Sequence, residues 1–197
     1  MELMLKNVRI AFCQSALGEA EDYEGNKNFR HSATFIVEPG SDNDKLIQSA
    51  IKTEAATLWG KKAEGMLEDM RGSKTQWCYP KNKKDKSGEV YEGFEGMFAL
   101  GSHRKQKDGK PTLLDNIKDP ATGKAAKLTG KEGRLYAGCY VNAKVSIYCQ
   151  AGTNSGVRSS LLGIQFAGKG DSFGGAGVAK DDDFDAIDAP EEADDLA

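Results

Sequence analysis

The alternation of side chains over residues 135–150, LYAGCYVNAKVSIYCQ, divides this segment into two unlike faces. One parity is aliphatic, running from Leu135 to Cys149. The other parity carries three tyrosines and a lysine, namely Tyr136, Tyr140, Tyr148 and Lys144. Because successive side chains of a strand point to opposite faces, the pattern predicts a long strand with one core face and one aromatic, polar face. Gly138 is expected to bend this strand, as in a sheet that closes into a barrel.

The rest of the sequence predicts four further strands and one main helix. Period-two patterns and β-branched or aromatic residues predict strands over residues 3–12, 29–38, 97–102 and 157–166, the last forming a hairpin with residues 135–150. Ser41 and Asp44 resemble a capping box, and apolar residues at helical spacing predict a helix that ends at Gly60. A second short helix is predicted over residues 63–70. These elements favour a mainly β fold, a five-stranded barrel with one main helix.

Basic and aromatic residues are mixed between Arg71 and Arg134, where 15 Lys or Arg stand against 8 Asp or Glu. Two stretches, PKNKKDKSG and SHRKQKDGK, are typical of basic loops. Aromatic rings that stack on bases, next to cations that hold phosphates, are suited to single-stranded nucleic acid. The alternative is that the aromatic residues belong to the core and the lysines to a solvated face. The core is favoured for Phe98, and both readings stay open for Trp77 and Tyr79.

The end of the chain differs in charge from the rest. Residues 181–197 hold nine acidic residues and no basic one, whereas residues 1–180 hold 27 basic and 21 acidic residues. We therefore expect a binding domain over residues 1–175 and a flexible, disordered acidic tail over residues 176–197. Such a tail can compete with DNA for the basic body, or dock on partner proteins through its apolar residues Phe184, Ile187 and Leu196. A tail that only adds solubility is the alternative.

Other classes of protein are disfavoured by what the sequence lacks. No segment has the roughly 18 apolar residues of a membrane span, and the N-terminus does not resemble a signal peptide, so a soluble intracellular protein is expected. The four cysteines form no CxxC pair and are expected to be reduced thiols, so zinc is not expected. The stretch GKGDSFGGAG lacks the Lys-Ser/Thr of a phosphate loop and is interpreted as a linker. We expect no cofactor, no metal and no catalysis.

Three stretches together resemble a known family. YAGCYVNAKVSIY, GVRSSLLGIQFAGKGDSFGG and the terminal run of acids are similar to the bacteriophage single-stranded DNA-binding proteins related to the replication binding protein of short-tailed coliphages. The resemblance is strongest over residues 134–175. It implies an OB-fold, sequence-independent binding that protects and organises single strands in phage replication and recombination, and an acidic tail that contacts replication proteins such as polymerase or helicase. It also implies that the protein acts in the cytoplasm of an infected bacterial cell. Related tails often end in phenylalanine, whereas this one ends in Leu196 and Ala197, so Phe184 is the candidate substitute.

The residues expected to bind DNA are the cations and aromatic residues of these stretches. They are Arg30, Trp77, Tyr79, Lys81, Lys83, Lys84, Lys86, Tyr91, Phe94, Arg104, Lys105, Lys107, Tyr136, Tyr140 and Lys144. The residues expected to bind partners are Asp181, Asp182, Asp183, Phe184, Asp185, Asp194 and Asp195. Tyr136 and Tyr140 are preferred to Tyr148 as stacking residues. A strand-annealing recombination protein, a metal-dependent nuclease and a purely structural protein are the alternative functions, and self-association is left open.

Overall fold

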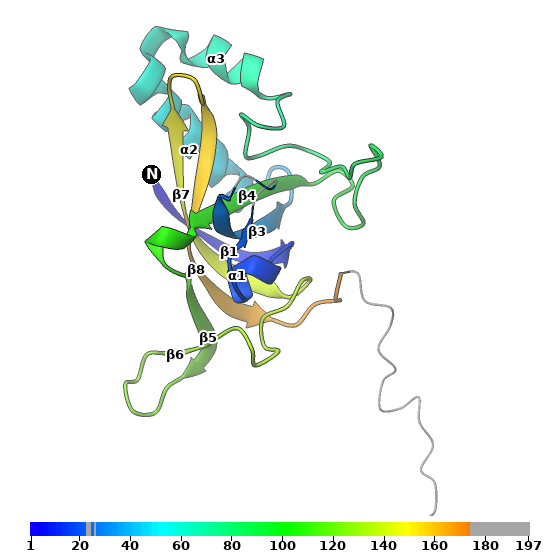
Figure 1. The fold of residues 1–197 in the computed structure, drawn as a ribbon, viewed down its shortest axis with the longest axis vertical. Helices are drawn as coiled ribbons and strands as arrows, with labels where there is room; N and C mark the ends of the chain where they lie inside the picture. The colour runs from blue at the N-terminus through cyan, green and yellow to red at the C-terminus, as the bar shows by residue number, and fades with distance from the viewer. Residues whose placement is uncertain (23–24, 26, 174–197) are drawn as a thin grey trace, which may run out of the picture.

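The fold was examined in a computed structural model, which describes residues 1–22, 25 and 27–173 (Figure 1). The predicted tail beyond residue 175 lies outside the described residues. The strands are β1 (Glu2–Ala11), β2 (Glu21–Asp22), β3 (Phe29–Val37), β4 (Phe98–Lys105), β5 (Thr112–Lys118), β6 (Ala125–Lys127), β7 (Tyr140–Gln150) and β8 (Gly156–Gly168). The helices are α1 (Gln14–Leu17), α2 (Asp42–Trp59) and α3 (Ala63–Met70), with 3₁₀ turns η1 (Gly60–Lys62) and η2 (Gln106–Asp108).

Five of the strands pair in a closed ring. β1 pairs with β3 and β7, β3 with β4, and β7 with β8, all antiparallel. The ring closes through a parallel pairing of β4 with β8, at His103 and Ser160. A five-stranded antiparallel ring closed by one parallel pair is the OB-like arrangement, and the mainly β fold expected from the sequence is therefore confirmed. In this arrangement β3 and β4 are the second and third strands of the ring.

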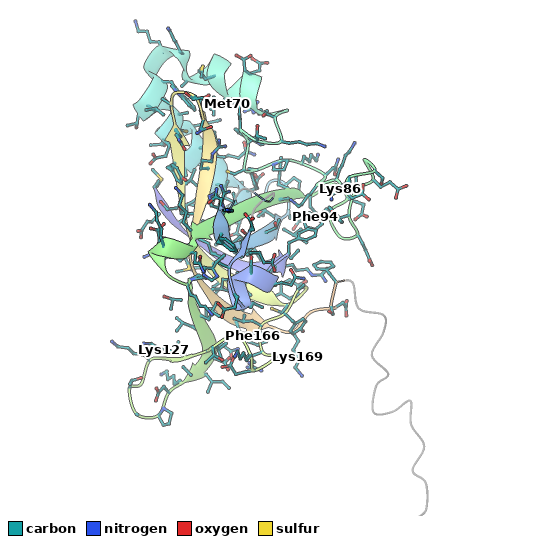
Figure 2. All side chains as sticks on the ribbon, in the orientation of Figure 1. Met70, Lys86, Phe94, Lys127, Phe166 and Lys169 are labelled. Carbon is teal, nitrogen blue, oxygen red and sulfur yellow. The ribbon has the colours of Figure 1, made fainter. Side chains whose placement is uncertain are left out.

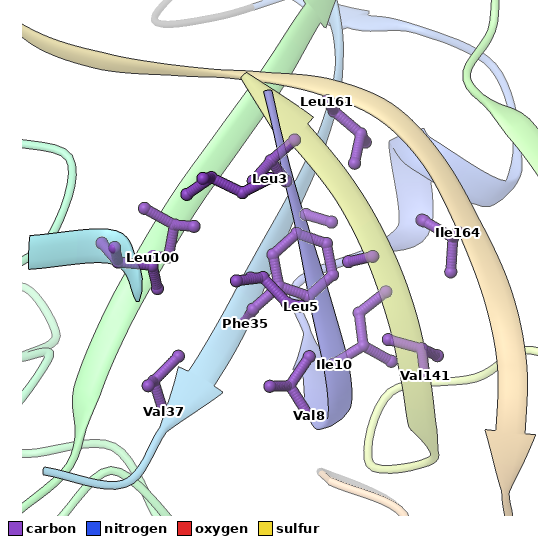
Figure 3. Close-up of a cluster of buried hydrophobic side chains, with 14 of the residues drawn as sticks. Leu3, Leu5, Val8, Ile10, Phe35, Val37, Leu100, Val141, Leu161 and Ile164 are labelled. Carbon is purple, nitrogen blue, oxygen red and sulfur yellow. The ribbon is translucent and has the colours of Figure 1, made fainter. Parts of the chain in front are cut away.

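The interior of the ring is filled by the aliphatic parity of each strand (Figure 3). In β7 the buried residues are Val141, Ala143, Val145 and Ile147, which are the predicted core face of that strand. Phe35 from β3, Leu100 from β4 and Leu161 from β8 meet them and are fully buried. Burial of such side chains contributes roughly 1.5–3 kcal/mol each and fixes which face of every strand points outward.

Helix α2 packs on the ring through a stripe of buried residues, Ile47, Ala50, Ile51 and Ala55, and lies against β7 and β1. The predicted N-cap at Ser41 is present, and the returning bond of the box goes to Gly40 instead of Ser41. The Oγ of Ser41 accepts from the Asp44 N–H at 3.2 Å, and the Asp44 carboxylate accepts from the Gly40 N–H at 2.8 Å. Burial alone would raise the pKa of Asp44, but hydrogen bonds from Gly40, Gln48 and Tyr79 outweigh burial and lower it.

Several predicted boundaries were wrong. The strand expected over residues 135–150 starts at Tyr140, because Tyr136–Cys139 form a turn in which Gly138 has φ +109°. Gly138 therefore does not bend the strand. β4 extends to Lys105 through part of the predicted basic loop, since its pairing with β3 continues to Arg30.

Two further features were not expected from the sequence. Phe12 leaves the alternation of β1 with φ +48° and is exposed rather than core. Residues 112–127 form the hairpin of β5 and β6, which extends from β8 and projects from the body of the protein (Figure 1).

The four cysteines are free thiols, as the sequence predicts. Cys13 and Cys139 are buried, and burial raises the pKa of Cys13 to about 12 and that of the half-buried Cys149 to about 11. Such thiols are poorly reactive. None of the described helices is long and apolar enough to span a membrane.

Candidate nucleic-acid interface

The outward side of β3 and β4 is called here the β3–β4 face. It carries every second residue of each strand, and these residues lie opposite one another across the pair. The register places Arg30 opposite Lys105, Ser32 opposite His103 and Ile36 opposite Ala99. Directly opposite residues of an antiparallel pair share one face of the sheet. The face is therefore basic at the end near Arg30 and apolar at the end near Ile36.

The basic end of the face opens into a cavity of about 280 Å³, called here the basic cavity. It is lined by His103, Arg104, Lys105, Lys107, Asp108, Tyr148 and Ser160. Arg104 shapes the wall, because its guanidinium donates to the carbonyl oxygens of Asp108 and Gly109.

Electrostatics show how closely the cations gather at this end. Burial, together with the nearby charges of Arg30, Arg158 and Lys105, lowers the pKa of His103 to about 4. The acidic residues beside this set are Asp108, in the cavity wall, and Glu21 of β2, which lies opposite Arg30. Like charges directly opposite one another destabilise a sheet, and a bound polyanion would relieve that repulsion.

The apolar end of the face is covered by the loop of residues 80–97. Phe94 from this loop is 1% exposed and packs with Ala11, Ile36 and Ala99 in a second, smaller core. The loop is closed by backbone hydrogen bonds from Asn82 N to Met97 O and from Tyr91 N to Lys83 O. Its lysines Lys84 and Lys86 are exposed, and Lys84 pairs with Val90 in an isolated bridge. Lys86 projects from the body of the protein on this loop (Figure 2).

Phe12, Tyr91 and Phe94, called here the aromatic cluster, lie at the edge of this covered end. Phe12 lies 4.9 Å from Tyr91, edge to face, and 5.9 Å from Phe94, measured between ring centroids. The ammonium group of Lys83 lies 5.4 Å from the centre of the Phe12 ring, and burial lowers the pKa of Lys83. Phe12 is 38% exposed although it is aromatic. Its left-handed backbone is rare for a bulky residue and costs on the order of 1–3 kcal/mol, which is typical of functional positions.

The tyrosines that precede and begin β7 are covered by the chain's own segment Lys169–Phe173. The Tyr136 hydroxyl donates to Gly170 O at 2.9 Å and accepts from Gly170 N at 3.1 Å. The backbone of Gly170 also lies against the ring of Tyr140, since a Cβ at Gly170 would come within 3.2 Å of that ring. Lys144 pairs with Glu2 at 2.8 Å. These three predicted site residues are therefore engaged within the chain and lie outside the β3–β4 face.

Arg9 fixes the same segment from β1. Its guanidinium donates to Asp171 O at 2.7 Å and to Gly138 O at 3.2 Å, and stacks 4.1 Å above the ring of Phe173. Phe173 in turn lies 6.5 Å from Phe94, between ring centroids. The segment Lys169–Phe173 thus ends beside the aromatic cluster.

A second cavity, of about 350 Å³, lies between α2, α3 and residues 77–81. Trp77, Tyr79 and Lys81 line it. Tyr79 is 2% exposed, stacks on Phe98 at 4.8 Å and donates to Asp44 at 3.0 Å, while the indole of Trp77 donates to Tyr79 O at 2.6 Å. The ring of Tyr79 therefore serves to attach the loop to α2.

Comparison with known proteins shows which family the chain belongs to. The family model described as Enterobacter phage Enc34, ssDNA-binding protein, matches residues 1–196. The chain belongs to this family. A curated relative, putative protein p50 of Acyrthosiphon pisum secondary endosymbiont phage 1, is 33% identical over 200 residues and covers 100% of both chains.

Solved structures of the Enc34 family and of a related phage protein share the fold. The single-stranded DNA-binding protein of bacteriophage Enc34 in complex with ssDNA matches with a TM-score of 0.64 at 14% identity, over 88% of this chain and 89% of that one. The protein gp2.5 of bacteriophage T7, a single-stranded DNA-binding protein, matches with a TM-score of 0.51 at 10% identity, over 93% and 92% of the two chains. At these identities the likeness concerns the fold.

In this member of the Enc34 family, the residues predicted from the sequence divide into four places. Arg30, Arg104, Lys105 and Lys107 gather at the basic cavity, and Lys83, Lys84, Lys86, Tyr91 and Phe94 belong to the loop at the aromatic cluster. Trp77, Tyr79 and Lys81 lie at the second cavity, and Tyr136, Tyr140 and Lys144 are engaged as described above. The seven predicted tail residues lie outside the described residues.

Sequence reasoning missed four residues that the structure adds to the β3–β4 face and its ends. They are Phe12, His103, Tyr148 and Arg158. An aromatic residue at the end of an alternating strand, directly before a polar loop, was the available signal for Phe12. The alternation marked Tyr148 as outward-facing but gave it second rank, and no local signal marks Arg158. Both reach His103 because β7, β8 and β4 are neighbours in the ring.

Proposed function

We propose that this chain binds single-stranded DNA, without sequence preference and without catalysis, along the β3–β4 face. The observation that carries the proposal is the arrangement of the face, with the exposed ring of Phe12 at one end and a cation-rich cavity at the other. Rings stack on any base at roughly 1–3 kcal/mol each, and cations contact phosphates irrespective of sequence. The face formed by the second and third strands is also the surface that OB-folds use for oligonucleotides.

The proposed role is to protect and organise single strands during phage DNA replication and recombination. This role is consistent with membership of the Enc34 family and with the single-stranded DNA binding of its structural relatives. The Tyr79 and Phe94 rings are not included in the binding surface, because both are covered in the described fold.

For the acidic residues 181–197 we propose competition with DNA and contact with replication proteins. Two observations support the competition. Phe173, which precedes the acidic residues in the chain, is held by Arg9 and Ala137 and packs on Phe94 of the aromatic cluster. The charge of the following sequence is opposite to that of the basic cavity. Asp181–Asp183, Phe184, Asp185, Asp194 and Asp195 are the residues proposed for these contacts.

The test is a titration of labelled oligo-dT with the intact chain and with a chain ending at residue 180, at two salt concentrations. We expect binding whose logarithm falls with the logarithm of salt by about 0.7 per phosphate contacted. Removal of the acidic residues is expected to strengthen binding, most at low salt, where charge repulsion is least screened. A full-length variant with all nine tail carboxylates changed to amides is the matched control for length.

Absence of oligo-dT binding at low salt would remove the proposed function. Equal binding by the intact and shortened chains would remove only the competition by the tail. Incubation of the labelled strand with magnesium and the protein checks for cleavage, and complementary strands added to the complex check for annealing.

A further inference from the structure

The hairpin of β5 and β6, with the turn between them, is called here the β5–β6 arm, and it presents positive charge away from the ring (Figures 1 and 2). Three lysines stand on it, Lys118 at the end of β5, Lys124 in the turn and Lys127 at the end of β6. All three are exposed, and none makes an ion pair or a side-chain hydrogen bond within the described part of the chain.

The acidic residues around the arm only partly offset these lysines, and none of them forms an ion pair with Lys118, Lys124 or Lys127 in the described part of the chain. Asp115 pairs with Arg134 at 3.0 Å. Asp119 accepts from the Ala121 N–H at 2.8 Å and so closes the turn. Glu132 accepts from the N–H groups of Thr129 and Gly130 and from the Thr129 hydroxyl, and these hydrogen bonds lower the pKa of Glu132 to about 2. Asp119 and Glu132 stay ionised, but from residue 116 to residue 127 three lysines stand against one acid, Asp119, so the arm keeps a net positive charge.

The arm is attached to the ring by a fixed base. β5 pairs in parallel with β8 from Thr112 to Leu114. The Arg134 guanidinium donates to Asp115 and Asn116 and stacks 4.1 Å above the Phe166 ring, and Gln165 donates to Asp115 O at 3.2 Å. A base held in this way reduces the entropy lost when the lysines bind a ligand.

The composition of the arm differs from that of the β3–β4 face in one decisive respect. From residue 112 to residue 134 there is no aromatic side chain. The arm can thus contact the phosphates of a nucleic acid, but it has no ring on which a base could stack. Its contacts would be insensitive to the bases.

The arm also follows the basic cavity without interruption along the chain. Lys105 and Lys107 line the cavity, and β5 begins five residues after Lys107. Because β5 and β4 both pair with β8, at successive positions of that strand, the base of the arm lies next to the end of β4 that carries the cavity. A strand that leaves the face at the cavity would meet the arm next.

From these observations we propose that the β5–β6 arm binds the phosphates of single-stranded DNA beyond the β3–β4 face and lengthens the binding site without reading bases. The inference rests on the proposed function, since the arm extends that site. Its ligand is the sugar–phosphate backbone of the strand that emerges from the basic cavity.

The experiment compares the variant K118Q/K124Q/K127Q with the matched control K61Q/K62Q/K74Q, which removes three exposed lysines from η1 and the segment after α3. Both are titrated with a short oligo-dT of about 8 nucleotides and a long one of about 30, chosen around the size range of OB-fold sites. The salt dependence of each affinity is measured for the full-length chain and for the chain ending at residue 180.

On the long oligonucleotide, the arm variant is expected to lose up to about 2 units of salt slope, since each lysine on a phosphate contributes about 0.7. Its binding to the short oligonucleotide should equal that of the control variant. Replacing the outer nucleotides of the long strand by abasic ones should leave wild-type affinity unchanged.

Three results would overturn the inference: an unchanged slope on the long strand, an equal loss of slope on the short strand, or a loss that disappears when residues 181–197 are removed. The last would mean that the arm contacts the acidic tail instead of DNA. If wild-type protein fails to bind even the short strand, the proposed function itself fails, which is a separate outcome.

Discussion

The two ends of the β3–β4 face combine opposite kinds of chemistry within one pair of strands. At the aromatic cluster the exposed ring of Phe12 offers a stacking surface, and the ammonium group of Lys83 lies over that ring. At the basic cavity Arg30, Lys105 and Arg158 act together on one histidine. Stacking depends little on salt, whereas phosphate contacts depend on it strongly. The face should therefore hold a strand by two contributions that salt can separate.

The largest expected effect comes from removing the stacking surface. In F12A, one exposed ring is lost, and affinity for oligo-dT is expected to fall by about 5- to 150-fold, corresponding to 1–3 kcal/mol per stacked base. The salt slope should stay as in the wild type. Fluorescence titration at several salt concentrations measures both quantities. A fall in slope together with affinity would show that Phe12 acts by holding Lys83 and does not stack.

A smaller loss of affinity at physiological salt, with a change in slope, is expected at the other end of the face. R30Q/K105Q removes two opposite cations and should lower the salt slope by about 1.4 units, if each contacts one phosphate. The same titration series measures it, and thermal unfolding without DNA is the control. An unchanged slope would place the strand elsewhere.

The smallest effect concerns pH. The pKa of His103 is lowered to about 4 from its ordinary value of 6.5, so the unfolded chain binds more protons between these values and stability falls as pH drops from about 6.5 toward 4. A phosphate in the basic cavity would oppose this by favouring the protonated ring. DNA affinity should then rise between pH 7.5 and 5.5, by less than about tenfold, which is the effect of one pKa unit. H103Q should lose this rise, and a wild-type affinity independent of pH would argue against a phosphate beside His103.

Local patterns predicted the core and the main helix, and tertiary pairing decided the rest. The alternation from Val141 to Ile147 and the cap at Ser41 are set by nearest neighbours, and both were confirmed. The closure of the ring between His103 and Ser160 joins residues 57 positions apart, which no short pattern reveals. The composition from Arg71 to Lys107 predicted the kinds of residue at the face. It did not predict that Tyr79 and Phe94 would be core, because a ring's burial depends on what folds over it.

The tyrosines of residues 135–150 show the same limit. Their parity suggested an open aromatic surface, yet Tyr136 and Tyr140 are covered by residues more than 25 positions later in the chain. Gly138 makes this possible, since a side chain there would overlap the backbone of Asp171. The glycine that was expected to bend a strand instead leaves room for a returning segment.

The segment Lys169–Phe173 determines how the proposed competition by the tail would depend on protein concentration. Because Phe173 is held beside the aromatic cluster, everything after it is tethered at the edge of the proposed DNA site. A tethered competitor acts at an effective concentration set by its linkage, so dilution of the protein does not weaken it. The proposed competition of the acidic residues with DNA should therefore not change when the protein is diluted, and a separately added tail peptide would need a far higher concentration to equal it.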